Sequence, residues 1–390
     1  LRKISVKMKI KETDCDLLAA EPLDLQGVSK GVAPNEIKIE DAYAACLTAV
    51  ADHPDIARFF FQLGRIELAR GNTKQAIELL KTAAARSHFR AETTLAEILW
   101  RGAGGETDVK SALSLLDRAA ANGDPYALHA LGKRLYHGDR VAQDRKRGLT
   151  LMLQAAEMGH TYAMNELGSI FESGDGVKPD PERALGFFKI SVERNDIYGY
   201  NNMAYLISQG KAGPADPKQA LELYIKAYKG GHPYAATNVG LMYYNGTGVE
   251  KDKAQAALWY GLAADRGDPY ASNNLGFMLL QGEAGEPDPA KAAVYYAHAI
   301  ALDQQEPRAA AELALIAIDE AQQAVAIGLL LKDLGFEPPK SPGKLSAKLR
   351  QALSAEYKAR GIGEPKGTTK TLVALARLKW LKSRPRFDLF

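Results

Sequence analysis

Apolar and small residues recur along this chain at a fixed interval of 36 residues. A large apolar residue followed by a small one stands at six positions in this spacing: Leu95-Ala96, Leu131-Gly132, Leu167-Gly168, Met203-Ala204, Val239-Gly240 and Leu275-Gly276. Aspartates follow in step at Asp108, Asp144, Asp180, Asp216, Asp252 and Asp288, and large apolar pairs such as Trp259-Tyr260 come after them. Columns that keep one spacing over six copies indicate tandem structural repeats.

Each repeat reads as two antiparallel helices. The apolar spacing predicts a first helix over residues 270–280 and a second helix over residues 253–265 in neighbouring copies. Asp252 and its equivalents stand where a helix N-cap accepts backbone hydrogen bonds, and Gly267 stands where a helix ends in a left-handed conformation. One such pair cannot bury both of its faces alone, so we expect the pairs to stack into an all-α solenoid.

The copy from Ala235 to Gly267 carries the motif that identifies the repeat. It reads Val239-Gly240, Gly246, Gly248, Asp252, Ala256, Trp259-Tyr260 and Ala263-Ala264. This pattern resembles the Sel1-like repeat, a relative of the tetratricopeptide repeat, and the resemblance covers about residues 55–318. It implies a right-handed α-solenoid of about eight helix-turn-helix repeats, whose first helices line a concave groove that binds a protein or peptide partner. Proteins of this kind are typically scaffolds or adaptors, so we expect no enzyme, no catalytic residues and no cofactor.

The chain divides into three predicted parts. Residues 1–40 form an N-terminal segment, residues 41–336 the repeat solenoid, and residues 337–390 a basic C-terminal helical extension. The segment "CDLLAAEP" resembles a lead-in that precedes such arrays in some bacterial proteins, a few of which carry a caspase-like or other enzymatic domain upstream. The alternative function is therefore that of a regulatory portion of a longer enzyme whose catalytic domain precedes Leu1.

Two cysteines, Cys15 and Cys46, fall near the start of the chain. Their spacing alone fits either two buried free thiols or a disulfide. The resemblance of the lead-in to those bacterial proteins favours the disulfide, and with it a periplasmic or secreted bacterial protein. A cytoplasmic location stays open.

Charge is distributed unevenly between the body and the C-terminal tail. Residues 340–390 hold thirteen Lys or Arg against three Asp or Glu, a local net charge of +10 in a chain whose total is +3. Residues 366–390 therefore either dock onto the repeats, which we prefer, or contact nucleic acid or an anionic membrane. At the other end, residues 4–10 alternate apolar and polar side chains, which predicts a strand that pairs with an upstream or associated domain, or else a disordered arm.

Other chemistry finds little support in the sequence. The turn "GTGVEKD" has glycines and lysines, but a phosphate-binding loop needs Gly-Lys-Ser/Thr after a buried strand, and a predicted helix precedes this turn. The seven histidines show no metal-binding spacing, so we expect no metal site. No apolar window reaches the length that spans a bilayer.

The best candidate site lies on the first helices. Asparagine is a poor helix former, yet asparagines recur there in two adjacent columns, and aromatic residues recur three to seven positions later in the same helices. These amides either bind the backbone of a partner or bridge adjacent repeats, and aromatics such as Trp100 and Tyr136 either line the groove or pack internally. The predicted partner-binding residues are Asn165, Asn201, Asn202, Tyr205, Asn238, Tyr244, Asn273, Asn274 and Phe277.

Overall fold

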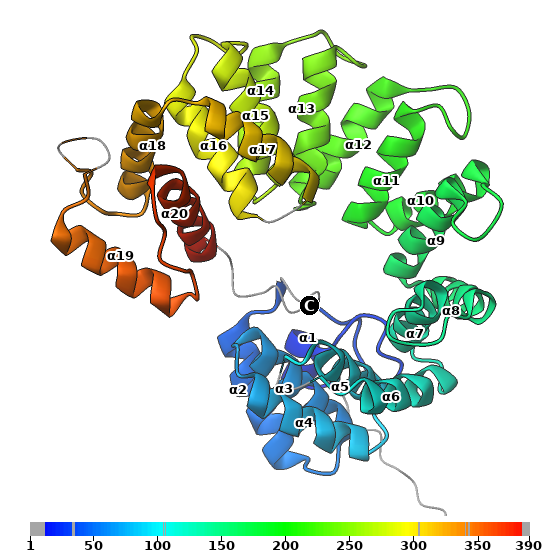
Figure 1. Ribbon diagram of the computed structural model, residues 1–390. Coiled ribbons are helices and arrows are strands. Elements are labelled where there is room, and N and C mark those ends of the chain that lie inside the picture. The colour runs from blue at the N-terminus through cyan, green and yellow to red at the C-terminus, as the bar shows by residue number, and fades with distance from the viewer. Residues whose placement is uncertain are drawn as a thin grey trace, which may run out of the picture. The chain divides into compact units, whose positions relative to one another are not determined.

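The computed structural model describes residues 12–32, 36–103, 105, 107–302, 305–339, 341 and 344–383 (Figure 1). Every regular element in these ranges is a helix, as the repeat pattern predicts. The strand expected over residues 4–10 lies outside the described residues.

The chain forms two compact units, one within residues 1–187 and one over Phe188–Arg384. The first unit contains α1 to α9, and the second contains α11 to α20. Helix α10 (Pro181–Glu193) spans the boundary. The helices of the first unit are α1 (Asp14–Ala19), α2 (Ile39–Asp52), α3 (Ala57–Ala69), α4 (Thr73–Ala85), α5 (Phe89–Arg101), α6 (Val109–Ala121), α7 (Pro125–His137), α8 (Arg145–Glu157) and α9 (Thr161–Ser173). Those of the second unit are α11 (Ile197–Ser208), α12 (Pro217–Lys229), α13 (Ala235–Asn245), α14 (Lys253–Asp265), α15 (Pro269–Gln281), α16 (Pro289–Ala301), α17 (Gln305–Ala317), α18 (Glu320–Asp333), α19 (Ala347–Ala359) and α20 (Thr368–Ser383).

The helices pair as the 36-residue spacing predicts: α3 with α4, α5 with α6, α7 with α8, α11 with α12, α13 with α14, and α15 with α16. Helix α14 has the predicted bounds, and α15 is one residue longer at each end than predicted. Asp252 accepts the backbone N–H of Gln255 at 2.9 Å, which confirms the predicted N-cap, and Gly267 has a φ of 86°. These signals limit the length of each helix, so equivalent positions of successive repeats recur on the same side.

The glycine-rich turn between α13 and α14 is a structural connection. Gly248 has a φ of 73°, and a Cβ atom there would lie 2.6 Å from the carbonyl of Pro217, so the position requires glycine. Lys253, one of the two lysines that follow, forms an ion pair with Glu283 at 2.7 Å. The interpretation of this turn as a helix connection is therefore confirmed.

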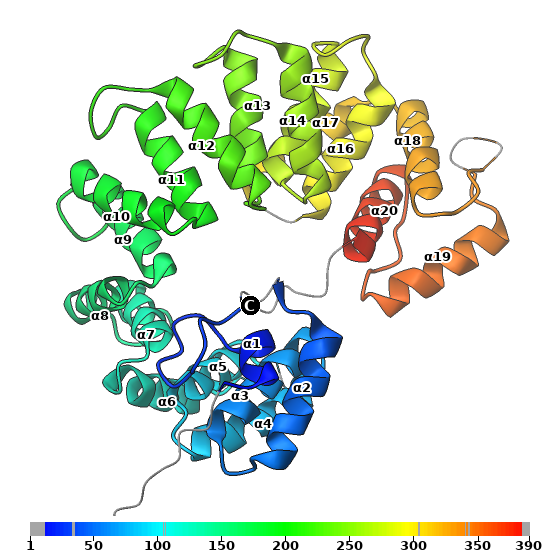
Figure 2. The same ribbon diagram turned by 180° about the vertical axis from the view of Figure 1, so that it is seen from behind.

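Helix α20 of the C-terminal extension packs against α16 and α18, which is the docking that we preferred for its described residues. Figure 2 shows α20 beside α18. Leu372, Leu375 and Leu378 on α20 are fully buried in a cluster that includes residues of α16 and α18. Helix α20 has 16 residues, longer than the roughly ten expected, because polar residues at both ends continue the helix beyond its apolar stretch. Leu353 and Tyr357 of α19 are buried in the same cluster.

Within the described residues, no single helix is both long and apolar enough to cross a membrane. One pair, Pro307–Ala317 and Glu320–Asp333, passes on length and composition but is bent by 118°.

Candidate protein-binding face

The first helices of the second unit, α11, α13 and α15, repeat one arrangement of side chains. Residues at positions i, i+3, i+4 and i+7 of a helix share one side. On α11 and α15 this side carries a tyrosine, then a polar pair, then a large apolar residue. On α13 the order is the same, with Tyr234 as the N-cap residue just before the helix. We call this surface the first-helix face; its members are Tyr198, Asn201, Asn202 and Tyr205; Tyr234, Thr237, Asn238 and Leu241; and Tyr270, Asn273, Asn274 and Phe277.

The apolar column of this face is exposed to solvent. Tyr205, Leu241 and Phe277 stand 36 residues apart, and their exposed fractions are 43%, 47% and 45%. Large apolar side chains that gather on one surface mark interaction sites more often than scattered ones do. The prediction that Tyr205 and Phe277 are accessible for a partner fits this exposure.

The tyrosine column lies about two helical turns away, toward the N-terminal ends of the same helices. Tyr198, Tyr234 and Tyr270 are 36%, 43% and 43% exposed. Sequence reasoning missed these tyrosines and also missed Leu241 as a contact residue. Both columns keep the 36-residue spacing, so a search for recurring large side chains at every position of the repeat would have found them.

The amide column joins neighbouring repeats. The Asn238 side-chain amide donates a hydrogen bond to Asn201 Oδ1 at 3.0 Å, and the Asn274 side chain is hydrogen-bonded to Tyr260 of α14. Thr237, in the same column as Asn201, donates its hydroxyl to Asp268 at the start of α15. Bridging between repeats, the alternative left open by the sequence, therefore holds for these residues. They remain half-buried, as do Asn202 and Asn273, so each also keeps some accessible surface.

One predicted partner-binding residue and two further aromatic candidates differ from this picture. Asn165, on α9 of the first unit, is only 7% exposed. Trp100 and Tyr136, which share a repeat position with Tyr244, are buried, and the guanidinium of Arg134 lies over the Trp100 ring. These side chains pack inside the first unit and offer a partner almost no surface.

Tyr244 stands at the edge of the face, near the turn that follows α13. Its ring is half-buried, and Lys253 Nζ lies 5.5 Å from the ring centre. A hydrogen bond to Glu283 raises the pKa of the Tyr244 hydroxyl. Tyr244 is thus held by the same ion pair that fixes the turn.

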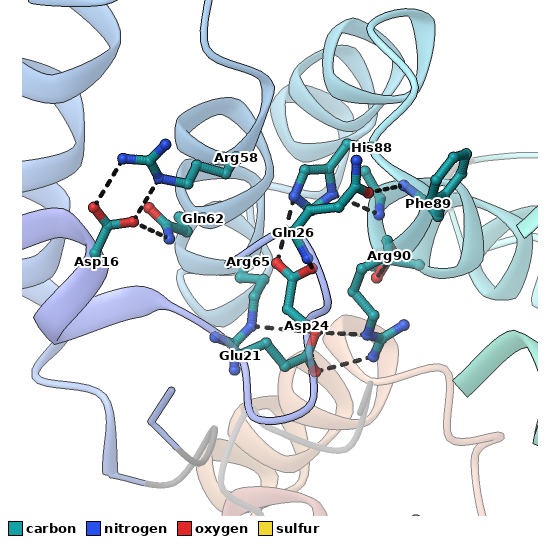
Figure 3. Close-up of polar contacts among 12 residues, drawn as sticks. Asp16, Glu21, Asp24, Gln26, Arg58, Gln62, Arg65, His88, Phe89 and Arg90 are labelled. Atoms are coloured by element: carbon teal, nitrogen blue, oxygen red, sulfur yellow. Dashed lines mark hydrogen bonds and ion pairs between the residues drawn. The ribbon is translucent and has the colours of Figure 1, made fainter. Parts of the chain in front are cut away.

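In the first unit, the chain's own N-terminal segment covers the corresponding side of the first helices (Figure 3). Arg90 on α5 and Tyr126 on α7 occupy the position of the tyrosine column. Arg90 Nε lies 2.7 Å from the Glu21 carboxylate, and the Tyr126 hydroxyl donates to the carbonyl of Pro22 at 2.9 Å. The N-terminal segment therefore occupies this position on α5 and α7, whereas on α9 the equivalent Tyr162 is exposed.

Further charged contacts anchor this N-terminal segment to α3. Arg58 Nε and Gln62 Nε2 both donate to Asp16 Oδ1 at 2.9 Å, and Arg65 donates to the carbonyl of Ala19 at 2.6 Å. Burial by itself would raise the pKa of Asp16, but the hydrogen bonds from Arg58 and Gln62 outweigh it and lower the pKa. Asp16 is fully buried, so its charge is stable only with these partners in place.

A disulfide closes the same region. Cys15 on α1 is bonded to Cys46 on α2, with the two Cα atoms 4.6 Å apart, and both residues are fully buried. The bond ties the short α1 helix to the first long helix of the chain, which confirms the predicted pairing. In the described part of the chain, no cluster of three or more potential metal ligands occurs.

Comparison with known proteins agrees with this architecture. The chain is similar in fold to a protective antigen present in uropathogenic Escherichia coli strains, at 24% identity and a TM-score of 0.53, over 87% of this chain and 72% of that one. It is also similar to a Sel1 repeat protein from Oxalobacter formigenes, at 23% identity and a TM-score of 0.56, over 63% of this chain and 98% of that one. No curated protein matches the sequence.

The family assignment follows from the repeats themselves. The model of the Sel1 repeat matches seven consecutive segments: residues 57–88, 90–124, 125–160, 161–196, 197–232, 233–268 and 269–303. These segments coincide with the helix pairs from α3–α4 to α15–α16 and cover more than half of the chain. The chain belongs to the Sel1 repeat family.

Proposed function

We propose that this protein is an adaptor that binds a protein partner on the first-helix face of its second unit. The observation that carries the proposal is the exposed apolar column of Tyr205, Leu241 and Phe277 on three successive first helices. Repeats of this kind generally mediate protein binding, and the exposure of the column supports this side of the repeats as the docking surface.

The composition of the face suits a protein ligand. Aromatic side chains give large contact areas at low cost in conformational entropy and are enriched among the residues that dominate binding energies. Tyrosine hydroxyls and half-buried asparagine amides between the two columns offer donors and acceptors to a partner's main chain. The apolar residues supply the affinity, and the amides orient the partner.

The first unit is a poorer candidate for the same role. Arg90 and Tyr126, at the positions of the tyrosine column on α5 and α7, contact the N-terminal segment, although Tyr162 on α9 is exposed. Lys133, at the position of the apolar column on α7, is paired with Glu166 at 2.8 Å. A partner would have to displace the network around Glu21 and Asp16 to reach these helices. We therefore assign partner binding to the second unit.

The buried disulfide supports a location outside the reducing cytoplasm. Disulfides persist in the periplasm and in secreted proteins and are rare in the cytosol. We infer a periplasmic or secreted bacterial adaptor, whose partner meets it in an oxidising compartment.

Photo-crosslinking from the face tests the proposal. A benzoylphenylalanine at Leu241 should crosslink a defined partner protein in cells. The control position is Leu258 on α14, a leucine of similar exposure (57%) on a second helix, where crosslinking of that partner should be absent. Equal crosslinking from the two positions would contradict the proposal.

A triple variant separates binding from folding. In this variant Tyr205, Leu241 and Phe277 are replaced by serine, and the crosslinker stands at Tyr234. Crosslinking of the partner should be abolished. The helical circular dichroism signal should stay unchanged, since all three side chains are about half exposed. The matched control replaces Leu258 by serine and should keep full crosslinking from Leu241. Retained crosslinking of the triple variant, probed from Tyr234, would overturn the assignment.

A further inference from the structure

A cavity of about 540 Å³ opens on the second unit between α17, α20 and the turn that precedes α20. Its apolar lining includes Ile300, Leu315, Ile316, Ile362, Val373 and Ala374. The volume falls within the range of roughly 300–1,000 Å³ that small-molecule sites occupy. None of the residues of the first-helix face lines this cavity.

We propose that this cavity binds a single-chain fatty acid. The alkyl chain lies on the apolar lining, and the carboxylate lies against the cations of α20. The proposal is independent of partner binding on the first-helix face.

The α20 side of the cavity has the layout that such a ligand requires. Lys370, Val373, Ala374 and Arg377 are spaced i, i+3, i+4 and i+7, so they lie on one side of the helix. Two small apolar residues thus form the floor, with one exposed cation at each end. The alkyl chain can lie across the floor with its carboxylate at either cation.

The charges around the cavity favour an anion. Arg308 Nε and Glu312 Oε1 form an ion pair at 2.9 Å, so these two charges offset each other. Of the other charged lining residues, Lys370 and Arg377 are cationic and only Glu364 is acidic. Among the described residues, no ion pair involves Lys370 or Arg377. An anionic headgroup would therefore gain a partner without displacing an existing one.

The polar lining argues against a peptide as occupant. A bound peptide must satisfy its main-chain N–H and C=O groups. Thr369 is the one uncharged polar side chain in the lining, and its hydroxyl already donates to Gln323 Oε1 at 2.7 Å. An alkyl chain makes no such demand, and it needs a polar contact only at its carboxylate.

Helix α17 extends the apolar surface beyond the cavity. Ile316, which lines the cavity, is 72% exposed, and Leu313 on the same helix is 74% exposed. They are the most exposed large apolar residues of the described chain. An alkyl chain longer than the cavity can continue along them and remove apolar surface from water.

Binding of cis-parinaric acid to the full chain tests the proposal. Its fluorescence rises in an apolar site, so a titration below its micelle concentration should give saturable binding with one molecule per chain. Palmitate should displace it, whereas hexadecanol, which has the same chain without the charge, should displace it about tenfold less well, which is the effect of one ion pair worth 1.4 kcal/mol. Absence of saturable binding, or equal displacement by the alcohol, would overturn the proposal.

Two variants locate the site. Lys370→Glu with Arg377→Glu changes only exposed residues and should weaken binding by tenfold or more, with two favourable charge contacts reversed. Lys348→Glu with Arg350→Glu makes the same change in net charge on α19, away from the lining, and should bind normally. If the two double variants bind cis-parinaric acid equally well, Lys370 and Arg377 do not form the site. Stronger displacement by a peptide with a C-terminal leucine than by palmitate would show a peptide site instead.

Discussion

Gly148 of α8 packs directly against Gly132 of α7. A Cβ atom at Gly148 would lie 2.6 Å from the carbonyl oxygen of Gly132 and 2.6 Å from the backbone nitrogen of Tyr136. The other repeats carry alanine at the position of Gly148, so the two helices of this pair approach more closely than an alanine permits.

Replacing Gly148 by alanine should therefore destabilise the first unit. The methyl group meets backbone atoms that cannot rotate away, and we expect a loss of about 1–3 kcal/mol, typical of overpacking. Thermal unfolding followed by circular dichroism, with hydrogen exchange on α7 and α8, measures the effect.

Gly186 provides the matched control. It also lies inside the second helix of a repeat, α10, but no other atom lies within 4 Å of a Cβ atom built at this position. Gly186→Ala should stabilise the chain by roughly 0.5–1 kcal/mol, because alanine loses less backbone entropy in a helix. The same sign for both substitutions would refute the close-packing account of Gly148.

Loss of the Cys15–Cys46 bond should loosen the start of the chain selectively. The bond closes a 31-residue separation, and replacing both cysteines by serine should cost about 2–4 kcal/mol. Hydrogen exchange should accelerate in α1 and α2 and stay unchanged in α15. The non-reduced intact chain should also weigh two hydrogen atoms less than the reduced chain; equal masses would show free thiols.

Acidification should destabilise the protein through buried histidines. His232 Nδ1 accepts the backbone N–H of Tyr234 at 3.3 Å, and burial lowers the pKa of His232 to about 4 from its ordinary 6.5. Between these values the unfolded chain binds a proton that the folded chain does not. The free energy of unfolding should thus fall as the pH drops from 6.5 toward 4, by at most about 1.4 kcal/mol per pH unit for this residue.

The chain itself suggests the control for this effect. The equivalent positions of the neighbouring repeats hold Asp196 and Asp268, which accept the same kind of backbone hydrogen bond. His232→Asn keeps an acceptor and removes the titration, so urea unfolding at pH 4.5 and pH 7 should show a smaller difference for the variant. An unchanged difference would mean that other groups, such as buried His160, cause the pH dependence.

The sequence predicted the helices well because the signals for each helix are local. Asp252 caps α14 through a backbone N–H three residues away, and Gly267 ends the same helix through its own φ angle. Repetition multiplies such signals, so a weak column in one copy is supported by the same column in five others. The predicted bounds of α14 therefore agree with the structure.

The candidate site was harder to predict because exposure depends on neighbours from other repeats. Asn165, Asn201 and Asn273 share one column, yet Asn165 is buried while the other two are half-buried. Tyr136 and Tyr244 share another, and only Tyr136 is fully enclosed. No local pattern distinguishes these residues, since the difference arises from what packs above each helix.

Local sequence patterns also could not predict where the N-terminal segment packs. Its contacts join residues far apart in sequence, such as Pro22 with Tyr126 and Glu21 with Arg90. Only the resemblance of the lead-in pointed to the disulfide. Nothing in the spacing of Asp16 or Glu21 indicated that these acids neutralise arginines of the repeats.

The placement of Asp16 and Glu21 has a practical consequence for anyone who shortens the chain for expression. A fragment that starts at the first matched repeat, residue 57, would lack Asp16 and Glu21 and leave Arg58, Arg65 and Arg90 without their carboxylates. Such a fragment would expose a cluster of unpaired guanidinium groups, which would bind acidic proteins non-specifically. Pull-down experiments with it would report false partners, so screening should use a chain that retains the N-terminal segment.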